Sequence, residues 1–320
     1  MPGPGDGFVR IARGAFMERI DAEAPVWRKK QLVTLARCVV ALRRSPEQAV
    51  LTHEAAAAVL GLSMMFQEPD IRVSVPAGAS RRPLVLAPMR YTTGQEIIEG
   101  RDVAVCRSAV RPDEAEVVTV HGLRVTSPLR TALDCACDLP VRWALPIIDS
   151  ALRVVCRPDR RSRYAFGEMS IEEARQELER MVARQGRRRG TRRARAAVAL
   201  ADPLAESPGE SVLRWAAGAA GLPAPVSQRR VEVDGHEYFL DLGYEQARRG
   251  WEFDGLGKIT APQDLREEKR RELRLAREGW AIDRFGWEEL WDATRLVRRA
   301  QRLWTTSGFE LGTSAAELWL

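Results

Sequence analysis

A hairpin in the last third of this 320-residue sequence, residues 236–254, constrains the fold more than any other stretch. It reads HEYFLDLGYEQARRGWEFD, two apolar strands joined by a short loop. A symmetric loop puts Asp241 directly opposite Glu252, with side chains about 5 Å apart on one face, where like charges repel. Asp254 shares the face of Glu252, because residues two apart on a strand point the same way. A divalent cation between these carboxylates would relieve the repulsion, and hard oxygen ligands favour Mg²⁺ or Mn²⁺.

The residues around this hairpin predict one α/β domain. Residues 207–222 contain a helix start, with Ser207 as the cap, a proline at the first position and Glu210 three residues past the cap. The order helix, three-strand meander, helix, strand, helix is typical of helices that cover one mixed sheet. After the meander, apolar spacing predicts a helix, a strand and a closing helix at residues 263–279, 280–287 and 288–304.

The length of the chain argues for two domains, since one hydrophobic core rarely serves 320 residues. Residues 1–155 begin with a hairpin pattern at 8–16 and alternate helix and strand patterns, which predicts a mixed α+β domain. Residues 156–203 are helical and charged and are interpreted as a linker or arm. Residues 204–320 form the α/β domain described above.

Neither a membrane segment nor a disulfide framework is expected. The first ten residues, MPGPGDGFVR, lack the basic flank and apolar core of a secretory signal. No apolar run approaches the roughly 20 residues that span a bilayer. Five cysteines, an odd number, indicate reduced and mostly buried thiols. A cytoplasmic location without a membrane partner is therefore expected.

The positive charge of the chain is local. The formal net charge is +6, yet residues 184–195 alone contain seven arginines and no acid, so the rest of the chain is close to neutral. Such a run is typical of an arm or helix that contacts DNA through its phosphates, although a solvated linker would show the same composition. The residues predicted to contact DNA are Arg187, Arg188, Arg189, Arg192, Arg193 and Arg195.

The acidic pattern of the last domain resembles that of PD-(D/E)XK nucleases. These have a glutamate on the preceding helix (here Glu210), an aspartate at a strand end (Asp241) and an acidic pair on the next strand (Glu252 and Asp254). The resemblance implies a restriction-endonuclease-like α/β/α fold and a site that hydrolyses phosphodiester bonds with Mg²⁺ or Mn²⁺.

A closer resemblance covers residues 206–303, which are similar to the DUF559-like domain, related to very-short-patch-repair endonucleases. In that domain an EFDG motif is followed by a lysine, by EKRRE and by GW. Here these correspond to Lys258, residues 268–272 and Gly279-Trp280. Asp254 stands where the nuclease motif normally has lysine, so the cation that polarises the phosphate has to come from elsewhere. Lys258, after the strand, and Lys269, on the next helix, are the two candidates.

The first part of the chain, residues 8–155, resembles an AbiEi-type antitoxin or transcriptional regulator. The similar stretches are VRIARGAF, LTHEAAAAVLGL and GLRVTSPLRTALD. The resemblance implies DNA as one partner and an operon-encoded toxin as another. Only one wing-like hairpin precedes the first helix, so the implied winged helix is truncated.

The resemblances imply two functions from different classes. The first is a metal-dependent DNA endonuclease or nickase in defence or repair, with Asp241, Glu252 and Asp254 as metal ligands. In it Glu210 is a ligand or an outer-shell base. The second is a non-catalytic DNA-binding regulator of antitoxin type with a degenerate nuclease-like domain.

Structural explanations compete for three of these residues. Glu210 fits a capping box with Ser207, Asp254 fits an ordinary turn before Gly255, and Lys269 fits a solvated helix face.

Overall fold

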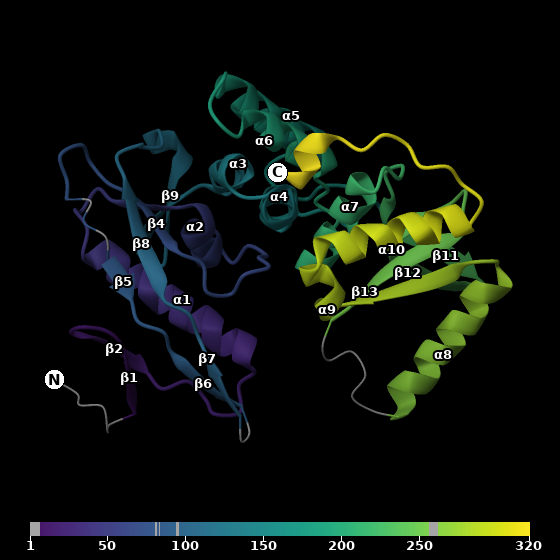
Figure 1. Cartoon of the computed structure of the whole chain (residues 1–320), viewed down its shortest axis with the longest axis horizontal. Coiled ribbons are helices and arrows are strands. Elements are labelled where there is room, and N and C mark those ends of the chain that lie inside the picture. Colours follow the sequence, from purple (N-terminus) through teal and green to yellow (C-terminus); the bar gives the residue numbers. More distant parts are fainter. Residues whose placement is uncertain (1–6, 81, 83, 94–95, 256–261) are drawn as a thin grey trace. The chain divides into compact units, whose positions relative to one another are not determined.

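The computed structural model describes residues 7–80, 82, 84–93, 96–255 and 262–320. It divides the chain into two compact units, residues 1–135 (unit 1) and residues 136–320 (unit 2). Both units mix helices and strands, which confirms the predicted α/β class (Figure 1). The division lies about twenty residues before the expected boundary at residue 155, because the helix that ends there packs within unit 2, as described below.

Unit 1 is built on a mixed six-stranded sheet. The order of its strands is β5-β8-β4-β3-β10-β9, in which β4 pairs parallel with β8 and β3 pairs parallel with β10. Its helical elements are α1 (Val26–Arg43), α2 (His53–Leu60), η1 (Glu114–Glu116) and most of α3 (Pro128–Asp138). Its strands are β1 (Phe8–Ala12), β2 (Ala15–Glu18), β3 (Val50–Thr52), β4 (Ile71–Ser74), β5 (Leu84–Leu86), β6 (Arg90–Thr93), β7 (Glu96–Glu99), β8 (Val103–Ser108), β9 (Val117–Val120) and β10 (Leu123–Thr126).

The beginning of unit 1 follows the sequence prediction closely. The β1–β2 hairpin turns at Gly14, whose φ of 71° suits a residue without a side chain. Ile11 of this hairpin and Val33 of α1 belong to one apolar cluster. In the described residues before β3, α1 is the only helix. Thr52 occupies the N-cap position of α2, but its side chain caps no backbone amide.

The first part of unit 2 is a group of packed helices. These are α4 (Val141–Cys156), α5 (Ile171–Arg184), α6 (Thr191–Leu200) and α7 (Pro208–Ala219), and α4 contacts the other three. Asp149 of α4 is buried and forms an ion pair with Arg214 of α7, and it accepts hydrogen bonds from Ser211 Oγ (2.6 Å) and the backbone N–H of Asp202 (2.8 Å). Residues 156–203, expected to be a linker or arm, therefore contain two helices packed against α4.

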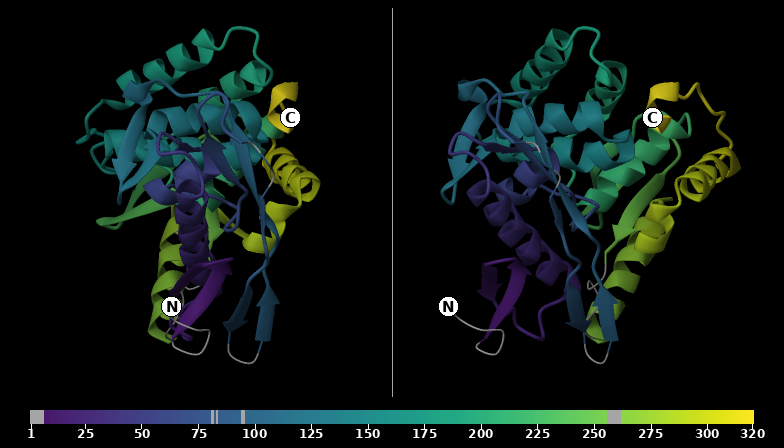
Figure 2. Two further views of the ribbon diagram at one scale, coloured as in Figure 1. Left: turned by 90° about the vertical axis from the view of Figure 1, so that its left-hand side faces the viewer. Right: turned by 60° about the vertical axis from the view of Figure 1, so that its left-hand side comes forward.

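The second part of unit 2 is a four-stranded sheet with helices on both sides (Figures 1 and 2). The strands are β11 (Val226–Val233), β12 (His236–Tyr244), β13 (Arg249–Asp254) and β14 (Ala281–Gly286), in that order. The first three form an antiparallel meander, and β14 is parallel to β13. The remaining elements are α8 (Pro262–Arg277), α9 (Trp287–Trp291), α10 (Ala293–Thr306) and η2 (Ala316–Trp319). The predicted order of elements is confirmed.

Two apolar layers hold this sheet between its helices. On one side, Leu275 of α8 packs with Leu240 and Trp280. On the other side, Tyr244 and Trp251 of the sheet pack edge to face, and Tyr244 also contacts Trp304 of α10. These side chains are all buried, so the two layers fix the strand positions from which the charged residues project.

Within the part of the chain that the structure describes, no helix is both long and apolar enough to cross a bilayer.

Candidate functional site

A cavity of about 290 Å³ in unit 2 collects most of the predicted acidic residues. Asp241 of β12 and Glu252 and Asp254 of β13 line it, as do Glu268 and Arg271 of α8 and Arg284 of β14. Gln228 of β11 and Arg160 and Glu206, from the helical part of unit 2, complete its polar lining. The cavity is therefore built by one sheet and the helices around it, and its lining contains both carboxylates and arginines.

The register of the hairpin is the one that the sequence predicts. Leu242 pairs with Trp251 and Tyr244 with Arg249, and the β12–β13 ladder ends there, so Asp241 and Glu252 are each one position beyond its last pair. Both carboxylates line the cavity, and so does Asp254, two residues beyond Glu252. The symmetric loop thus brings together three acidic side chains from two strands.

The charge that compensates Glu252 comes from the protein itself. Arg271 of α8 binds both carboxylate oxygens of Glu252, one of them at 3.0 Å. Asp241 accepts a hydrogen bond from the backbone N–H of Phe253 at 2.8 Å. A divalent ion is therefore not required to make this pair tolerable, because a guanidinium and a backbone amide already stabilise the two carboxylates.

Arg271 is held firmly in this position. Burial opposes its charge, but hydrogen bonds and charges from Glu252 and Glu268 together raise its pKa above the ordinary range. Glu268 also binds Arg284, which pairs with Glu272 at 2.7 Å. Arg271 therefore carries a permanent positive charge at the wall of the cavity.

Glu210 lies beside the cavity at the start of α7 and is buried, with 5% of its surface exposed. Its backbone N–H donates to Ser207 Oγ at 3.2 Å, so Ser207 is the cap that the sequence predicts. Its carboxylate does not complete the capping box. It accepts from the backbone N–H of Glu206 (2.8 Å) and from Gln228 Nε2 (3.0 Å). Burial first, and then the charge of Asp241, raise the pKa of Glu210 to about 7.

Gln228, like Arg271, is a site residue that the sequence does not indicate. It is 3% exposed and has a φ of 48° within β11, a backbone conformation that non-glycine residues rarely adopt. Strain of this kind clusters at functional sites, where the surrounding structure holds it. Its amide donates to Glu210, and no pattern in the sequence indicates this contact.

The two predicted lysines differ from their expected roles. Lys258 lies outside the described residues. Lys269 is exposed on α8, while the described residues that line the cavity include Arg271 of the same helix. The described cation nearest to Glu252 is therefore an arginine two positions further along the EKRRE stretch than the predicted lysine.

The donor atoms of the cavity suit a hard divalent ion in kind. Carboxylate oxygens of Asp241, Glu252 and Asp254, with Glu210 beside them, are the ligands that Mg²⁺ and Mn²⁺ prefer. Among the described residues, however, no three such side chains are already arranged as a metal site. The arrangement fits an ion only if Arg271 releases Glu252, so Arg271 and a metal would compete for the same oxygens.

The arginine run predicted to contact DNA forms the turn between α5 and α6 and the first turns of α6. Three of its members hold the helices of unit 2 together: Arg188 pairs with Asp138 at 3.3 Å, Arg192 pairs with Glu317, and Arg193 donates to the carbonyl oxygen of Cys137. The exposed members without such contacts among the described residues are Arg187, Arg189 and Arg195.

Comparison with known proteins gives one family match. Residues 48–200 match the family model of the AbiEi antitoxin C-terminal domain. Two curated proteins of Mycobacterium tuberculosis, the uncharacterized proteins MT2308 (strain CDC 1551) and Rv2248 (strain H37Rv), are each 31% identical over 169 residues. The match covers 52% of this chain and 56% of each relative, so the chain spans about half the length of the curated relatives it matches.

Two solved structures from Helicobacter pylori show weak similarity. One, described as a candidate nucleotidyltransferase, is 19% identical with a TM-score of 0.25 and covers 36% of this chain and 60% of its own. The other, JHP933, is 18% identical with a TM-score of 0.28. This match covers 41% of this chain and 67% of JHP933. At these values neither structure bears on the activity of this chain.

Proposed function

We propose that the acidic cavity of unit 2 is a metal-dependent site that hydrolyses phosphodiester bonds in DNA, as an endonuclease or nickase. The observation that carries this proposal is the convergence of Asp241, Glu252 and Asp254 on one cavity that also contains Arg271. Carboxylates alone would repel a phosphate, whereas carboxylates beside guanidinium groups can bind a metal ion and a phosphate together.

The element order and hairpin register also support a PD-(D/E)XK-like, DUF559-like domain over residues 204–320. Glu210 lies on the helix before the meander, Asp241 near the end of β12, and the acidic pair on β13. This assignment belongs to the proposal, since the family model matches residues 48–200.

Each residue has a defined part in the proposed chemistry. Asp241, Glu252 and Asp254 would hold Mg²⁺ or Mn²⁺, and a bound ion activates water and neutralises charge that develops on the phosphate. Glu210, with a pKa of about 7, can accept a proton near neutral pH. Arg271, once released from Glu252, can bind the phosphate oxygens and so take the place of the lysine that the motif lacks.

Plasmid cleavage tests this proposal directly. Supercoiled DNA is incubated with the full chain and Mn²⁺ or Mg²⁺, beside Asp241→Asn and the matched control Glu245→Gln. The asparagine side chain of the first variant would keep an oxygen that accepts from the backbone N–H of Phe253 but lose the negative charge. Glu245 is an exposed carboxylate at the turn of the same hairpin and lies outside the described lining of the cavity. We expect cleavage by the wild type and the control, and at least a hundredfold slower cleavage by Asp241→Asn. Equal activity of all three proteins, or none in any, would refute the proposal.

A second function is favoured by a different observation. The match of residues 48–200 to the AbiEi antitoxin domain supports a non-catalytic DNA-binding regulator with an operon-encoded toxin as partner. Under this alternative the full chain binds DNA in EDTA but leaves plasmid intact with either metal. Co-expression with the neighbouring gene product and co-purification of the pair would test the toxin partner.

A further inference from the structure

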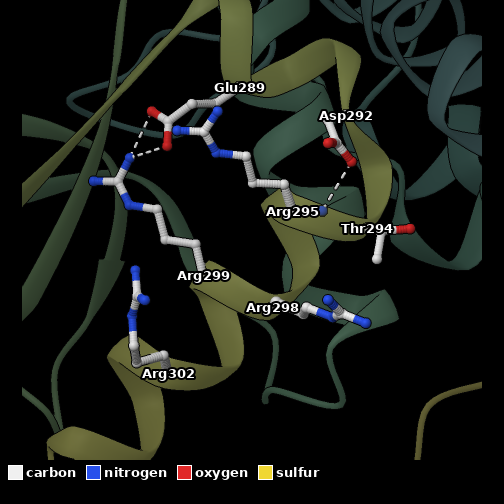
Figure 3. Close-up of a pocket in the computed structure, with 7 residues that line it drawn as sticks. All are labelled: Glu289, Asp292, Thr294, Arg295, Arg298, Arg299 and Arg302. Carbon is white, nitrogen blue, oxygen red and sulfur yellow. Dashed lines mark hydrogen bonds and ion pairs between the residues drawn. The ribbon is translucent and has the colours of Figure 1, made fainter.

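A second charged surface of unit 2 lies along α10, away from the predicted arginine run in the sequence. A cavity of about 520 Å³ is lined by Arg295, Arg298, Arg299 and Arg302, with Glu289, Asp292 and Thr294 at its edge (Figure 3). The four arginines come from one helix of fourteen residues that contains no acid. We call these four side chains and their cavity the α10 arginine surface.

One of the four arginines has a structural role. Arg299 pairs with Glu289 (Figure 3). It also donates to the carbonyl oxygen of Arg284 at 2.8 Å and lies over the ring of Phe285 at 4.1 Å. It thereby anchors α10 to β14. Because Arg284 also projects into the acidic cavity, the same strand end supports both sites.

The other three arginines lack such partners. Arg295, Arg298 and Arg302 are exposed, and among the described residues no hydrogen bond or ion pair engages their guanidinium groups. Asp292 uses its side chain to cap the helix through the backbone N–H of Arg295 at 2.9 Å. Like charges three and four residues apart destabilise a helix. An anionic partner would remove this repulsion.

The spacing of these charges fits the backbone of duplex DNA. Arg295 and Arg302 are seven residues apart, which is about 10 Å along the helix axis. Phosphates on one strand recur about every 3.4 Å along a duplex, so three side chains can reach consecutive phosphates. The described lining is polar and contains no aromatic ring on which a base could stack. It therefore suits contacts to phosphate and not base recognition.

We propose that the α10 arginine surface binds the phosphate backbone of duplex DNA through Arg295, Arg298 and Arg302. This inference rests on the proposed function only in its choice of DNA as the partner. It requires no cleavage, and it applies equally to a hydrolase and to a regulator.

The test compares two basic surfaces of the full chain with the same change in charge. Binding to a fluorescent 30-base-pair duplex is measured by anisotropy in EDTA over a range of salt concentrations. The first variant is Arg295→Gln/Arg298→Gln/Arg302→Gln. The second is Arg187→Gln/Arg189→Gln/Arg195→Gln, which removes three exposed charges from the predicted run. A third variant, with lysine at positions 295, 298 and 302, keeps the charge.

The α10 glutamine variant should bind DNA more weakly than the wild type. Its plot of log K against log salt concentration should also be less steep, by about 2.7 in slope, because each of the three lost phosphate contacts contributes about 0.9. The lysine variant should keep most of the slope. Circular dichroism should give an unchanged or higher melting temperature for the α10 variant, since repulsion is removed. An unchanged slope in the α10 glutamine variant, or a loss shared equally by the two glutamine variants, would overturn the inference.

Cleavage separates this inference from the proposed function. If DNA affinity depends on α10 while no metal supports plasmid cleavage, the binding surface stands and the hydrolase fails. If Asp241→Asn abolishes cleavage while affinity is independent of α10, the hydrolase stands and this inference fails.

Discussion

Glu210 gives unit 2 a dependence of stability on pH that can be measured. Its folded pKa of about 7 lies above the ordinary 4.5, so between these values the folded chain holds a proton that the unfolded chain has released. The stabilisation is present below pH 4.5 and is lost as the pH rises through 7. Glu210→Gln removes this titration. The variant should therefore gain stability relative to wild type between about pH 5 and about pH 8, by roughly 1–3 kcal/mol.

Urea denaturation at the two pH values checks this prediction. Asp149, whose pKa is raised to about 6 mainly by burial, titrates in both proteins and cancels in the comparison. The quantity compared is the unfolding free energy of Glu210→Gln minus that of the wild type. If this difference is the same at both pH values, Glu210 does not hold an extra proton in the folded state.

Arg271 is the second residue whose removal has a defined consequence. Arg271 and Glu252 are largely buried, with 18% and 13% of their side chains exposed, so each depends on the other for its charge. Arg271→Gln should lower the free energy of unfolding by about 1–3 kcal/mol, because it leaves a mostly buried carboxylate unpaired. A double-mutant cycle with Glu252→Gln measures the pair directly. If the double variant loses as much stability as the two single variants added together, Arg271 and Glu252 do not interact.

For single residues, the sequence predicts where the acidic side chains of the hairpin lie better than it predicts which side chains bind them. The register that pairs Leu242 with Trp251 and brings Asp241 and Glu252 to one cavity follows from a short loop and the alternation of a strand, both of which are local. Arg271 and Gln228 reach the site through contacts with residues nineteen and eighteen positions away. Their neighbours in sequence look like an ordinary charged helix and an ordinary strand, so only the packing of α8 and β11 reveals them.

The position of α7 against the sheet depends on one glycine. A Cβ on Gly209 would overlap the ring of Phe253, which is itself held edge-on by Trp287 at 4.9 Å. Gly209→Ala should therefore push the start of α7, with Glu210, away from β13 and lower stability by about 1–3 kcal/mol. Plasmid cleavage should fall as well.

Gly218, in the same helix, supplies the matched control. The three atoms nearest to a Cβ there are side-chain methyl carbons of Leu200 and Leu318, at 3.2–3.4 Å. Gly218→Ala should be neutral or stabilising, by up to about 1 kcal/mol, because alanine favours a helix. Thermal denaturation of both variants measures the difference. Equal effects would mean that the Gly209 contact does not position α7.

Helices and strands with a clear apolar pattern or a clear end signal can be predicted from the sequence, whereas short strands without such a pattern cannot. Helix α2 ends at Gly61 in a left-handed conformation, and the order of elements in residues 207–306 agrees with the sequence. The closing helix, predicted as one, is divided at Asp292, whose side chain caps α10. The strands β3, β7 and β8 give weak signals in the sequence, since β3 has three residues and the other two are flanked by charged residues. Their formation depends on pairing with distant strands.

The division of the whole chain follows from the packing of α4. Composition placed the boundary near residue 155, but Asp149 of α4 is the buried partner of Arg214. A fragment of residues 127–320 keeps α3 and α4 and should unfold cooperatively and bind DNA. A fragment of residues 156–320 leaves Arg214 buried without its carboxylate and should not fold stably. Circular dichroism and thermal melting of both fragments test this, and equal stability would contradict it.

The central claim is that the acidic cavity of unit 2 exchanges an internal arginine for a metal ion. Anomalous diffraction from crystals of the full chain soaked in Mn²⁺ tests it most directly. We predict a peak about 2.2 Å from oxygens of Asp241 and Glu252, with Arg271 displaced from Glu252. Density that retains the Arg271–Glu252 pair and contains no manganese peak in this cavity would contradict the claim.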